Sequence, residues 1–444
     1  MTMSEVTLHQ ILDARDRRAA RQRALLDTYQ TPLVCFTMNI AGPIKTSPLI
    51  ERAFFDGLEV LQQKLPTDSI RHREVEIADT GCQAMLCVAL DAERLKAICV
   101  AVEETSPVGR LFDMDVLNTD GVKLSRKGTR GCLVCGAEGR ACAAGRLHTV
   151  AELQAVTHRI LTEHFWETDH RRLAVLAVES LLDEVYTTPK PGLVDGRNNG
   201  SHTDMDVSTF VKSAEALQPY FAECLVIGHR TCTLPPHETF PLLRKAGVAA
   251  EAAMYRATNG VNTHKGAIYS LGVVCGAVGR LWNAGQICFA PQELLPLCAE
   301  MTREAVQADL ACIDDATAGG RLYRTHGLTG IRGEVAAGFP SIATVGLPVY
   351  RRLLQSGLSA NDAGAITLVH LVATVQDTTL YHRGGVEGAA FAADAARQLI
   401  GGDVMPTVAQ LERLDDEFIA RRLSPGGCAD LLAVTYFLHK ITAE

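Results

Sequence analysis

The hydrophobic pattern of this 444-residue chain changes near residue 150, and no other feature constrains its fold as strongly. Before that point, short apolar runs between turns predict strands, and one amphipathic run predicts a helix over 47–65. The predicted strands cover 32–40, 73–79, 82–90 and 95–104. Beyond it, apolar residues recur at helical spacing over 171–186, 239–257, 264–282, 291–310 and 360–376. The predicted fold is therefore multidomain, with an N-terminal α/β domain followed by an all-α helical domain.

The two predicted domains join within residues 150–172. This stretch contains no Ser/Gly-rich or Pro-rich linker, so a helix over 149–170 is predicted to bridge them. We place the N-terminal domain at 1–165 and the helical domain at 166–444. A chain of this length suits two domains.

Composition excludes several classes of protein. The net charge of −8 gives no general attraction to nucleic-acid phosphates. The fourteen cysteines are scattered behind a polar N-terminal segment that lacks an apolar signal core, which favours reduced thiols and a cytoplasmic location. The longest apolar run, 266–282, is rich in glycine and is expected to form a buried helix, so no membrane span is predicted.

Two acidic residues stand out in the first domain. Asp113 and Asp115 are two apart in an apolar extended segment, so both carboxylates project from one face. Such a pair is costly without a cation between it, and oxygen ligands of this kind suit Mg²⁺. Solvated acids on an exposed edge strand are the alternative. Basic residues nearby favour the magnesium site; they are Arg110, Lys123, Arg126, Lys127 and Arg130.

A second group of basic residues lies near the start of the chain. Arg15, Arg18 and Arg21 fall at near-helical spacing. They are predicted to clamp phosphate oxygens from a second side, because guanidinium groups bind such oxygens in pairs. A solvated helix face is the alternative interpretation.

A cluster of possible zinc ligands ends the first domain. Cys132 and Cys135 form a Cys-x-x-Cys pair, and Cys142 and His148 follow closely. Three thiolates and one imidazole complete a tetrahedral zinc shell, which would be structural rather than catalytic. Buried reduced cysteines and a redox pair are the alternatives.

The second domain concentrates polar residues at three places. The loop after 186 holds the first group: Asp195, Asn198, Asn199, His202, Asp204 and Asp206. Residues 262–265 precede an apolar helix, and 377–385 end another. Asn262 or Thr263 is expected to cap the helix, whose N-terminus with Lys265 offers a phosphate site. Because bundles build sites from facing helices, these segments are expected to converge with Arg332, Glu334 and Arg383.

The residues of the first domain resemble a known family, the apo-citrate lyase phosphoribosyl-dephospho-CoA transferases, also called citrate lyase holo-acyl-carrier synthases. The similar segments are ARDRRAARQ at 14–22, MNIAGPIKTS at 38–47, GRLFDMDVL at 109–117, LSR at 124–126, and CLVC at 132–135 with Cys142 and His148.

The second domain resembles the triphosphoribosyl-dephospho-CoA synthases. The similar segments are PKPGLVD at 189–195, NNGSHTDM at 198–205, ATNGVNTHKGAIYSLG at 257–272, HGLTGIRGEVAAGFP at 326–340, DTTLYHRGG at 377–385 and LSPGGCADLL at 423–432. Together the two resemblances cover most of the chain and imply a fused, bifunctional transferase.

The resemblance implies two consecutive reactions. The synthase would join the ribose of ATP to 3′-dephospho-CoA, releasing adenine and retaining the triphosphate. The transferase would then move phosphoribosyl-dephospho-CoA onto a serine of the apo acyl-carrier subunit of citrate lyase, releasing pyrophosphate. ATP, 3′-dephospho-CoA and that subunit are therefore the expected partners, with neither nucleic acid nor membrane among them. By analogy with other paired-aspartate transferases, a nucleotidyltransferase-like sheet is expected.

Chemistry assigns roles to the candidate residues. In the transferase, Asp113 and Asp115 are expected to hold Mg²⁺ and activate the serine, while phosphates bind Arg15, Arg18, Arg21, Arg110 and Arg126. In the synthase, loss of adenine develops oxocarbenium character, which needs carboxylates and a proton donor. The catalytic candidates are Asp195, Asp204, also a Mg²⁺ ligand, His264, Glu334 and Asp377. The substrate-binding candidates are His202, Asn262, Lys265, Arg332 and Arg383.

Two other classes of function are open to a chain with this sequence. The Cys/His cluster suits a zinc-containing binding module, although aromatic residues, at 5%, are few for a reader of RNA. A catalytically inactive scaffold for citrate lyase assembly would keep the fold and lose turnover.

Overall fold

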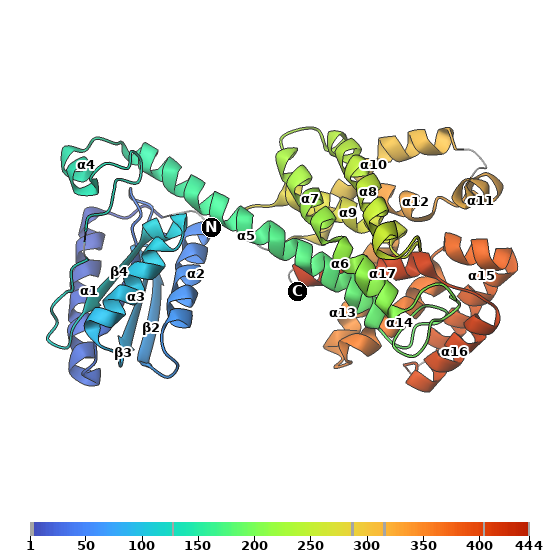
Figure 1. The fold of residues 1–444 in the computed structure, drawn as a ribbon, viewed down its shortest axis with the longest axis horizontal. Helices are drawn as coiled ribbons and strands as arrows, with labels where there is room; N and C mark the ends of the chain where they lie inside the picture. Colours follow the sequence, from blue (N-terminus) through green and yellow to red (C-terminus); the bar gives the residue numbers. More distant parts are fainter. Residues whose placement is uncertain (1–3, 127, 286–287, 314–316, 403–404, 443–444) are drawn as a thin grey trace. The chain divides into compact units, whose positions relative to one another are not determined.

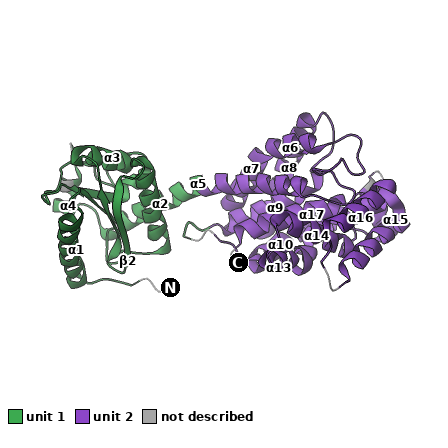
Figure 2. Ribbon diagram, turned by 90° about the horizontal axis from the view of Figure 1, so that it is seen from below, with its two compact units in different colours: residues 1–168, 283–286 green, residues 169–282, 287–444 purple. Residues whose placement is uncertain are grey.

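The computed structural model describes residues 4–126, 128–285, 288–313, 317–402 and 405–442. The chain forms two compact units (Figure 2). Unit 1 comprises Met1–Thr168 and Asn283–Gln286, and unit 2 comprises Asp169–Trp282 and Ile287–Glu444. In the described parts of the chain, every helix is too short or too polar to cross a membrane. No disulfide bond joins the cysteines in the described parts of the chain.

Unit 1 is built on a four-stranded antiparallel sheet with the order β2-β3-β1-β4. The strands are β1 (Leu33–Met38), β2 (Ile70–Ala78), β3 (Gly81–Val88) and β4 (Phe112–Leu117). These strands match the predicted segments 32–40, 73–79 and 82–90 and the extended stretch around Asp113. An N-terminal α/β unit followed by a mostly helical one is thus confirmed.

The two faces of this sheet carry different helices. The face bearing Phe36 packs against α2 (Pro48–Lys64), where the Phe36 and Phe54 rings stack with centroids 4.9 Å apart. The opposite face packs against α1 (Leu8–Tyr29), whose Leu25 and Leu26 bury beside Leu33. Figure 1 shows α1 and α2 on either side of the strands. Asp113 and Asp115 lie on the α1 face, because they alternate with the buried side chains of β4.

The strand register places polar residues in two rows across the α1 face. The first row is Glu76–Gln83–Thr37–Asp113, and the second is Glu74–Met85–Cys35–Asp115. Strands lie about 4.8 Å apart, so Gln83 and Asp113 are separated by about 10 Å along the first row. The register therefore puts Gln83 of β3 and Glu76 of β2 on the same face as the aspartate pair, two and three strands away from it.

The predicted strand over 95–104 is wrong, because this segment belongs to helix α3 (Ala92–Glu104). Asp91 caps the helix by accepting the Arg94 N–H at 3.0 Å. Leu95, Cys99 and Val102 are buried at a spacing of four and three residues, which is the helical period. A ten-residue apolar run fits both periods, and the cap at Asp91 decides between them.

Unit 2 is helical. The residues predicted to bridge the domains share one helix with 171–186, and the part from Asp169 onward belongs to unit 2. That helix, α5, runs unbroken over Val150–Tyr186. The others are α6 (Val207–Ala216), α7 (Gln218–Arg230), α8 (Thr239–Ala257), α9 (Lys265–Leu281), α10 (Pro291–Ala311), α11 (Ala318–His326), α12 (Gly330–Ala336), α13 (Leu347–Gln355), α14 (Ala360–Thr374), α15 (Thr378–Ile400), α16 (Val408–Ala420) and α17 (Gly426–Ile441). Unit 1 also contains α4 (Gly139–Gly145).

Helix α9 lies at the centre of unit 2, where most of its side chains are buried. It packs against α7 at a glycine contact: a Cβ on Gly228 would come 2.0 Å from the carbonyl oxygen of Gly276. Glycine at this crossing lets the two backbones approach closely. At the other end of α9, Gly266 lies against Asp430 of α17.

Candidate active sites

A cavity of about 1170 Å³ in unit 1 gathers most of the predicted transferase residues. Asp113 and Asp115 line it from β4. Its other lining residues include Arg110, Lys123, Arg126, Arg130, Cys132, Cys142 and His148. The acidic pair, the basic residues and the cysteine cluster thus face one space. Lys127 lies outside the described residues.

The two aspartates are in different electrostatic settings. Asp115 pairs with Lys123, whose Nζ lies 2.5 Å from its Oδ2. Burial in the cavity wall, and then the charge of Asp115, raise the pKa of Asp113. Lys123 and Arg130 act in the opposite direction. A divalent cation bound between the two carboxylates would relieve their repulsion, and the donor set suits Mg²⁺.

Two buried side chains of α3 hold the strand between the aspartates. Glu103 Oε1 accepts the Met114 N–H at 2.8 Å, and Lys96 Nζ donates to the Met114 carbonyl at 2.9 Å. Because β4 is an edge strand of the described sheet, the N–H and the carbonyl of Met114 have no hydrogen-bond partner on a further strand. Sequence reasoning missed both residues because it assigned 95–104 to a strand.

The arginines of the cavity are held by neighbours in unit 1. Arg130 donates to the Phe112 carbonyl at 2.7 Å and pairs with Glu103 at 2.6 Å. Arg110 donates to the Gly131 carbonyl at 2.7 Å. Arg126 pairs with Glu104 and is only 17% exposed. Their guanidinium groups are therefore positioned along the cavity wall before any phosphate binds.

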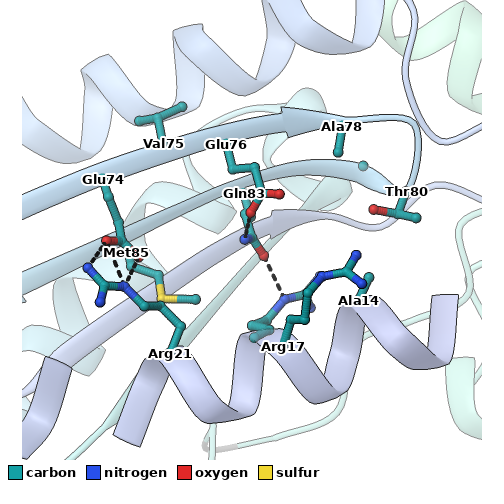
Figure 3. Close-up of a pocket in the computed structure, with 12 residues that line it drawn as sticks. Ala14, Arg17, Arg21, Glu74, Val75, Glu76, Ala78, Thr80, Gln83 and Met85 are labelled. Atoms are coloured by element: carbon teal, nitrogen blue, oxygen red, sulfur yellow. Dashed lines mark hydrogen bonds and ion pairs between the residues drawn. The ribbon is translucent and has the colours of Figure 1, made fainter. Parts of the chain in front are cut away.

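Arg17, Arg18 and Arg21 of α1 line a separate, smaller cavity of about 350 Å³ (Figure 3), and Arg15 is not among its lining residues. Arg21 makes two hydrogen bonds from Nε and one from Nη2 to Glu74, the shortest being 2.7 Å, and Arg18 Nε donates to Gln83 at 2.9 Å. Figure 3 shows Arg21 and Glu74 pointing toward one another. The charge of Arg21 is thus already compensated, whereas Arg18 bonds a neutral amide in the same row as Asp113. Arg15 lies near Lys45, whose pKa is lowered by burial and then by Arg15.

In unit 2, Asp195 organises the loop between α5 and α6. Its Oδ2 accepts the Lys190 N–H at 2.7 Å, and its Oδ1 accepts the N–H groups of Arg197 and Asn198 at 2.7 and 3.0 Å. Asp415 of α16 holds the same loop through the Gly192 N–H and the Asn198 amide. Figure 1 shows this loop, drawn in green. Both carboxylate oxygens of Asp195 therefore already accept hydrogen bonds from main-chain N–H groups.

The rest of that loop meets α15 and the start of α17. Arg383 donates to the Ser201 carbonyl at 3.0 Å, and its Nη2 lies 3.1 Å from Nδ1 of His202. His202 Nε2 lies 2.9 Å from Ser424 Oγ. Burial and then Arg383 lower the pKa of His202 to about 4, while Asp204 opposes this shift. Asp204 itself is exposed. The Asn199 carbonyl accepts the His202 N–H, and Asp206 caps α6.

The segment before α9 differs in one detail from the expectation. The capping position is His264, not Asn262 or Thr263. Asn262 Oδ1 still accepts the Lys265 N–H at 3.3 Å, while the Thr263 hydroxyl donates to Ser213. Lys265 is exposed and pairs with Glu251 at 2.8 Å. Because the His264 side chain accepts no hydrogen bond from α9, the first main-chain N–H groups of this helix need other acceptors.

His264 is buried beneath the start of α9. Its Nδ1 lies 2.7 Å from Ser213 Oγ, and Nε2 has no hydrogen-bond partner among the described residues. Burial, and then the charge of Lys190, lower the pKa of His264 to about 3. The imidazole is therefore neutral at physiological pH and poorly suited to donate a proton.

Asp377 and Glu334 both serve main-chain groups. Asp377 Oδ1 accepts the N–H groups of Thr379 and Leu380 at the start of α15, and Oδ2 accepts the Cys428 N–H at the start of α17. Burial raises the pKa of Asp377 in spite of these donors. Glu334 accepts the Ser341 N–H at 2.7 Å, and burial raises its pKa as well. Arg332 is exposed.

Three residues that sequence reasoning missed connect these segments. Lys190 is buried and donates to the carbonyl and to Oε1 of Glu184, both at 2.6 Å. Asp430 lies against the start of α9, where a Cβ on Gly266 would come 1.9 Å from its Oδ2. Burial, then Glu184 and then Asp377, raise the pKa of Asp430 far above its usual value, although the Ala267 N–H opposes this. The loop after α5 and the starts of α9 and α15 therefore converge, as the sequence predicted, and the start of α17, which the sequence did not single out, joins them.

Comparisons with known proteins agree with this division of the chain. Residues 6–164 match the family described as apo-citrate lyase phosphoribosyl-dephospho-CoA transferase, and residues 170–444 match ATP:dephospho-CoA triphosphoribosyl transferase.

Individual relatives span one or both regions. The protein named CitXG of Haemophilus influenzae is 35% identical, over 98% of this chain and 96% of its own length. Its namesake in Leuconostoc mesenteroides subsp. cremoris is 32% identical, over 99% and 98%. A probable 2-(5″-triphosphoribosyl)-3′-dephosphocoenzyme-A synthase of Vibrio cholerae is 41% identical, over 61% of this chain and 88% of its own length. This chain therefore belongs to the CitXG family, in which an apo-citrate lyase phosphoribosyl-dephospho-CoA transferase region precedes an ATP:dephospho-CoA triphosphoribosyl transferase region.

Proposed function

We propose that the protein makes the prosthetic group of citrate lyase and attaches it. Unit 2 joins the ribose of ATP to 3′-dephospho-CoA and releases adenine. Unit 1 transfers phosphoribosyl-dephospho-CoA to a serine of the apo acyl-carrier subunit and releases pyrophosphate. The observation that carries this proposal is the match of both family regions, in order, to one chain whose relatives share nearly its whole length.

The cavity of unit 1 supports the transfer step. The serine oxygen bonds to the phosphorus that carries the ribose, and the bond from that phosphorus to pyrophosphate breaks. The serine proton passes to Asp113, whose carboxylate lines the cavity. When bound by Asp113 and Asp115, Mg²⁺ supplies stabilisation of the polyphosphate charge. Arg110 and Arg126, which line the same cavity, bind the phosphates of substrate and leaving group.

The sheet of unit 1 supports a nucleotidyltransferase-like assignment in one respect. Two carboxylates on one strand face a basic cavity, which is the arrangement that metal-assisted transfer to a hydroxyl requires. The resemblance of the fold is by analogy. A cytoplasmic location stays a prediction.

In unit 2, the synthase reaction breaks the bond from ribose C1′ to adenine and forms one from C1′ to the 2′-hydroxyl of dephospho-CoA. Adenine takes up a proton and the hydroxyl loses one. We assign donation to Asp430, because it lies against the start of α9 and burial raises its pKa well above the usual range of a carboxyl, while His264 is neutral. Asp204, exposed beside His202, takes the hydroxyl proton or holds Mg²⁺ on the triphosphate.

The remaining candidates of unit 2 bind or position. Arg383 and Lys265 are proposed to bind phosphates of the substrates through their positive charges. Arg332, which is exposed, is the third cation proposed for this role. Asp195, Asp377 and Glu334 hold main-chain N–H groups and so shape the site rather than react. His202 and Asn262 orient the loop and the start of α9.

The test of this proposal measures both products from the full-length protein. Incubation with ATP, 3′-dephospho-CoA and Mg²⁺ is expected to release adenine, and adding the apo acyl-carrier subunit is expected to release pyrophosphate. A folded preparation that releases neither would contradict the proposal and favour an inactive assembly scaffold. Omitting Mg²⁺ is expected to stop both reactions.

A further inference from the structure

We propose that Cys132, Cys135, Cys142 and His148 bind a structural zinc ion that fixes one wall of the transferase cavity. The zinc site rests on geometry alone. Its consequence for carrier transfer rests on the proposed function of unit 1.

The four side chains already form a compact donor set. One donor atom from each lies within 4.8 Å of all the others. The sulfurs of Cys135 and Cys142 are 3.5 Å apart, and His148 Nε2 is 3.3 Å from the Cys135 sulfur. Tetrahedral zinc with sulfur ligands at about 2.3 Å separates those sulfurs by about 3.8 Å. A zinc ion therefore fits with shifts of a few tenths of an ångström at these contacts.

The local backbone explains why the first two cysteines point inward. The Gly136 N–H donates to the Cys132 carbonyl at 3.0 Å, and Gly136 adopts φ +75°, which favours glycine. The Val134 N–H points at the Cys132 sulfur at 3.4 Å. A turn that directs main-chain donors at a thiolate stabilises the charged ligand that zinc requires.

The other two ligands come from different elements. Cys142 lies on α4, and His148 lies just before α5, whose start is capped by Thr149 and Glu152. A helix as short as α4 is marginal on its own. A metal ion that joins the turn, α4 and the start of α5 would supply the cross-link that this small region otherwise lacks.

The same region forms part of the transferase cavity. Cys132, Cys142 and His148 line it together with Asp113. Directly before Cys132, the Gly131 carbonyl accepts from Arg110, and Arg130 donates to the carbonyl of Phe112, the residue before Asp113. The segment 130–132 thus connects the cysteine turn to the aspartate strand. Zinc that fixes this turn also fixes Arg130 and the cavity wall.

Metal analysis of the full-length protein tests the site directly. Protein purified under reducing conditions with zinc supplied is expected to hold about one zinc ion per chain, because the four ligands form one site. When Co²⁺ replaces zinc, the protein is expected to show thiolate-to-metal charge-transfer absorption. Cys135→Ser and His148→Ala are expected to lose most of the metal. Cys232→Ser, which changes an exposed cysteine of unit 2, is the matched control and is expected to keep it. A parent protein without zinc, or Cys135→Ser with full zinc, would overturn the site.

Activity measurements then test the consequence. Removing zinc with a chelator, followed by dialysis into excess Mg²⁺, is expected to lower pyrophosphate release at least tenfold and to leave adenine release unchanged. Adding Zn²⁺ back is expected to restore transfer. If zinc is bound but its removal leaves transfer intact, the role in the cavity wall is wrong. If the zinc-loaded parent transfers nothing, the proposed function of unit 1 fails, while the metal analysis still decides the zinc site.

Discussion

The carboxylate of Glu103 accepts the main-chain N–H of Met114, with Oε1 2.8 Å from the nitrogen. Only 4% of the Glu103 side chain is exposed, and the same carboxylate pairs with Arg130. Since Met114 separates the two aspartates, this contact fixes the strand that carries them. Lys96 completes the arrangement through the Met114 carbonyl. Two side chains of one helix thus replace the missing neighbour of an edge strand.

Replacing Glu103 by Ala is expected to destabilise unit 1 by about 3 kcal/mol, because it leaves the half-buried Arg130 and the main-chain N–H of Met114 without their acceptor. Denaturant unfolding followed by a probe in unit 1 measures this. Glu93→Gln, on the exposed face of the same helix, is the control and is expected to cost under about 1 kcal/mol. If Glu103→Ala is as stable as this control, the contacts of Glu103 with Met114 and Arg130 do not stabilise unit 1.

Asp113→Asn is expected to lower pyrophosphate release by at least about 100-fold, because it removes both a base and a metal ligand. Adenine release is expected to stay at the parent level. Asp204→Asn is expected to do the reverse. The two product assays check both variants, with Asp120→Asn, in the exposed turn after β4, as the control. Loss of both reactions from either folded variant would contradict separate sites.

Asp430→Asn is expected to lower the kcat of adenine release by about 100-fold or more, since an amide cannot supply the proton. A purely structural role would lower the melting temperature as well, so both are measured, together with the pH profile of kcat. Gly266→Ala is expected to have a similar effect, because its Cβ would occupy the place of the Asp430 oxygen. Glu223→Gln, exposed on α7, is the control. Normal turnover by Asp430→Asn would exclude it as the donor.

His264 is expected to make unit 2 sensitive to acid. Its pKa of about 3 in the folded protein lies below the value of 6.5 that it has when unfolded, so the unfolded state binds the extra proton. The stability that it contributes is therefore complete above pH 6.5 and falls with decreasing pH by up to about 1.4 kcal/mol per unit.

Comparison of the parent with His264→Gln isolates this contribution, because carboxyls with raised pKa values, such as Asp377, act in the opposite direction in both proteins. The stability difference between the two is expected to shrink between pH 7 and pH 4.5, as measured by denaturant unfolding of unit 2. A difference that stays constant over this range would show that His264 titrates normally.

Sequence patterns were sufficient for features that depend on local spacing. The two-residue period of a strand placed Asp113 and Asp115 on one face, and four closely spaced ligands indicated the metal cluster. The segment 95–104 was misassigned because its apolar residues satisfy the helical and the strand period equally.

Partners that are distant in sequence were beyond such reasoning. Asp195 and Asp377 have the residue type of catalytic acids, yet their oxygens are committed to main-chain N–H groups that only the folded chain brings to them. Conversely, Asp430 lies in a segment that reads as an ordinary helix start, and its pKa is raised by burial and then by Glu184 and Asp377, which are distant in sequence. Residue type suggests chemistry, whereas tertiary contacts decide which acid remains available for it.

The shared cap at Asp377 has a consequence for how genetic data on this family are interpreted. The Asp377 side chain accepts main-chain N–H groups at the starts of two helices that begin about fifty positions apart in sequence. A single substitution of Asp377 would therefore loosen both helix starts at once. In a screen for inactive variants this position would score as essential whether or not it ever meets a nucleotide. Measuring how much folded protein each such variant yields is the only way to tell a broken scaffold from a broken catalyst.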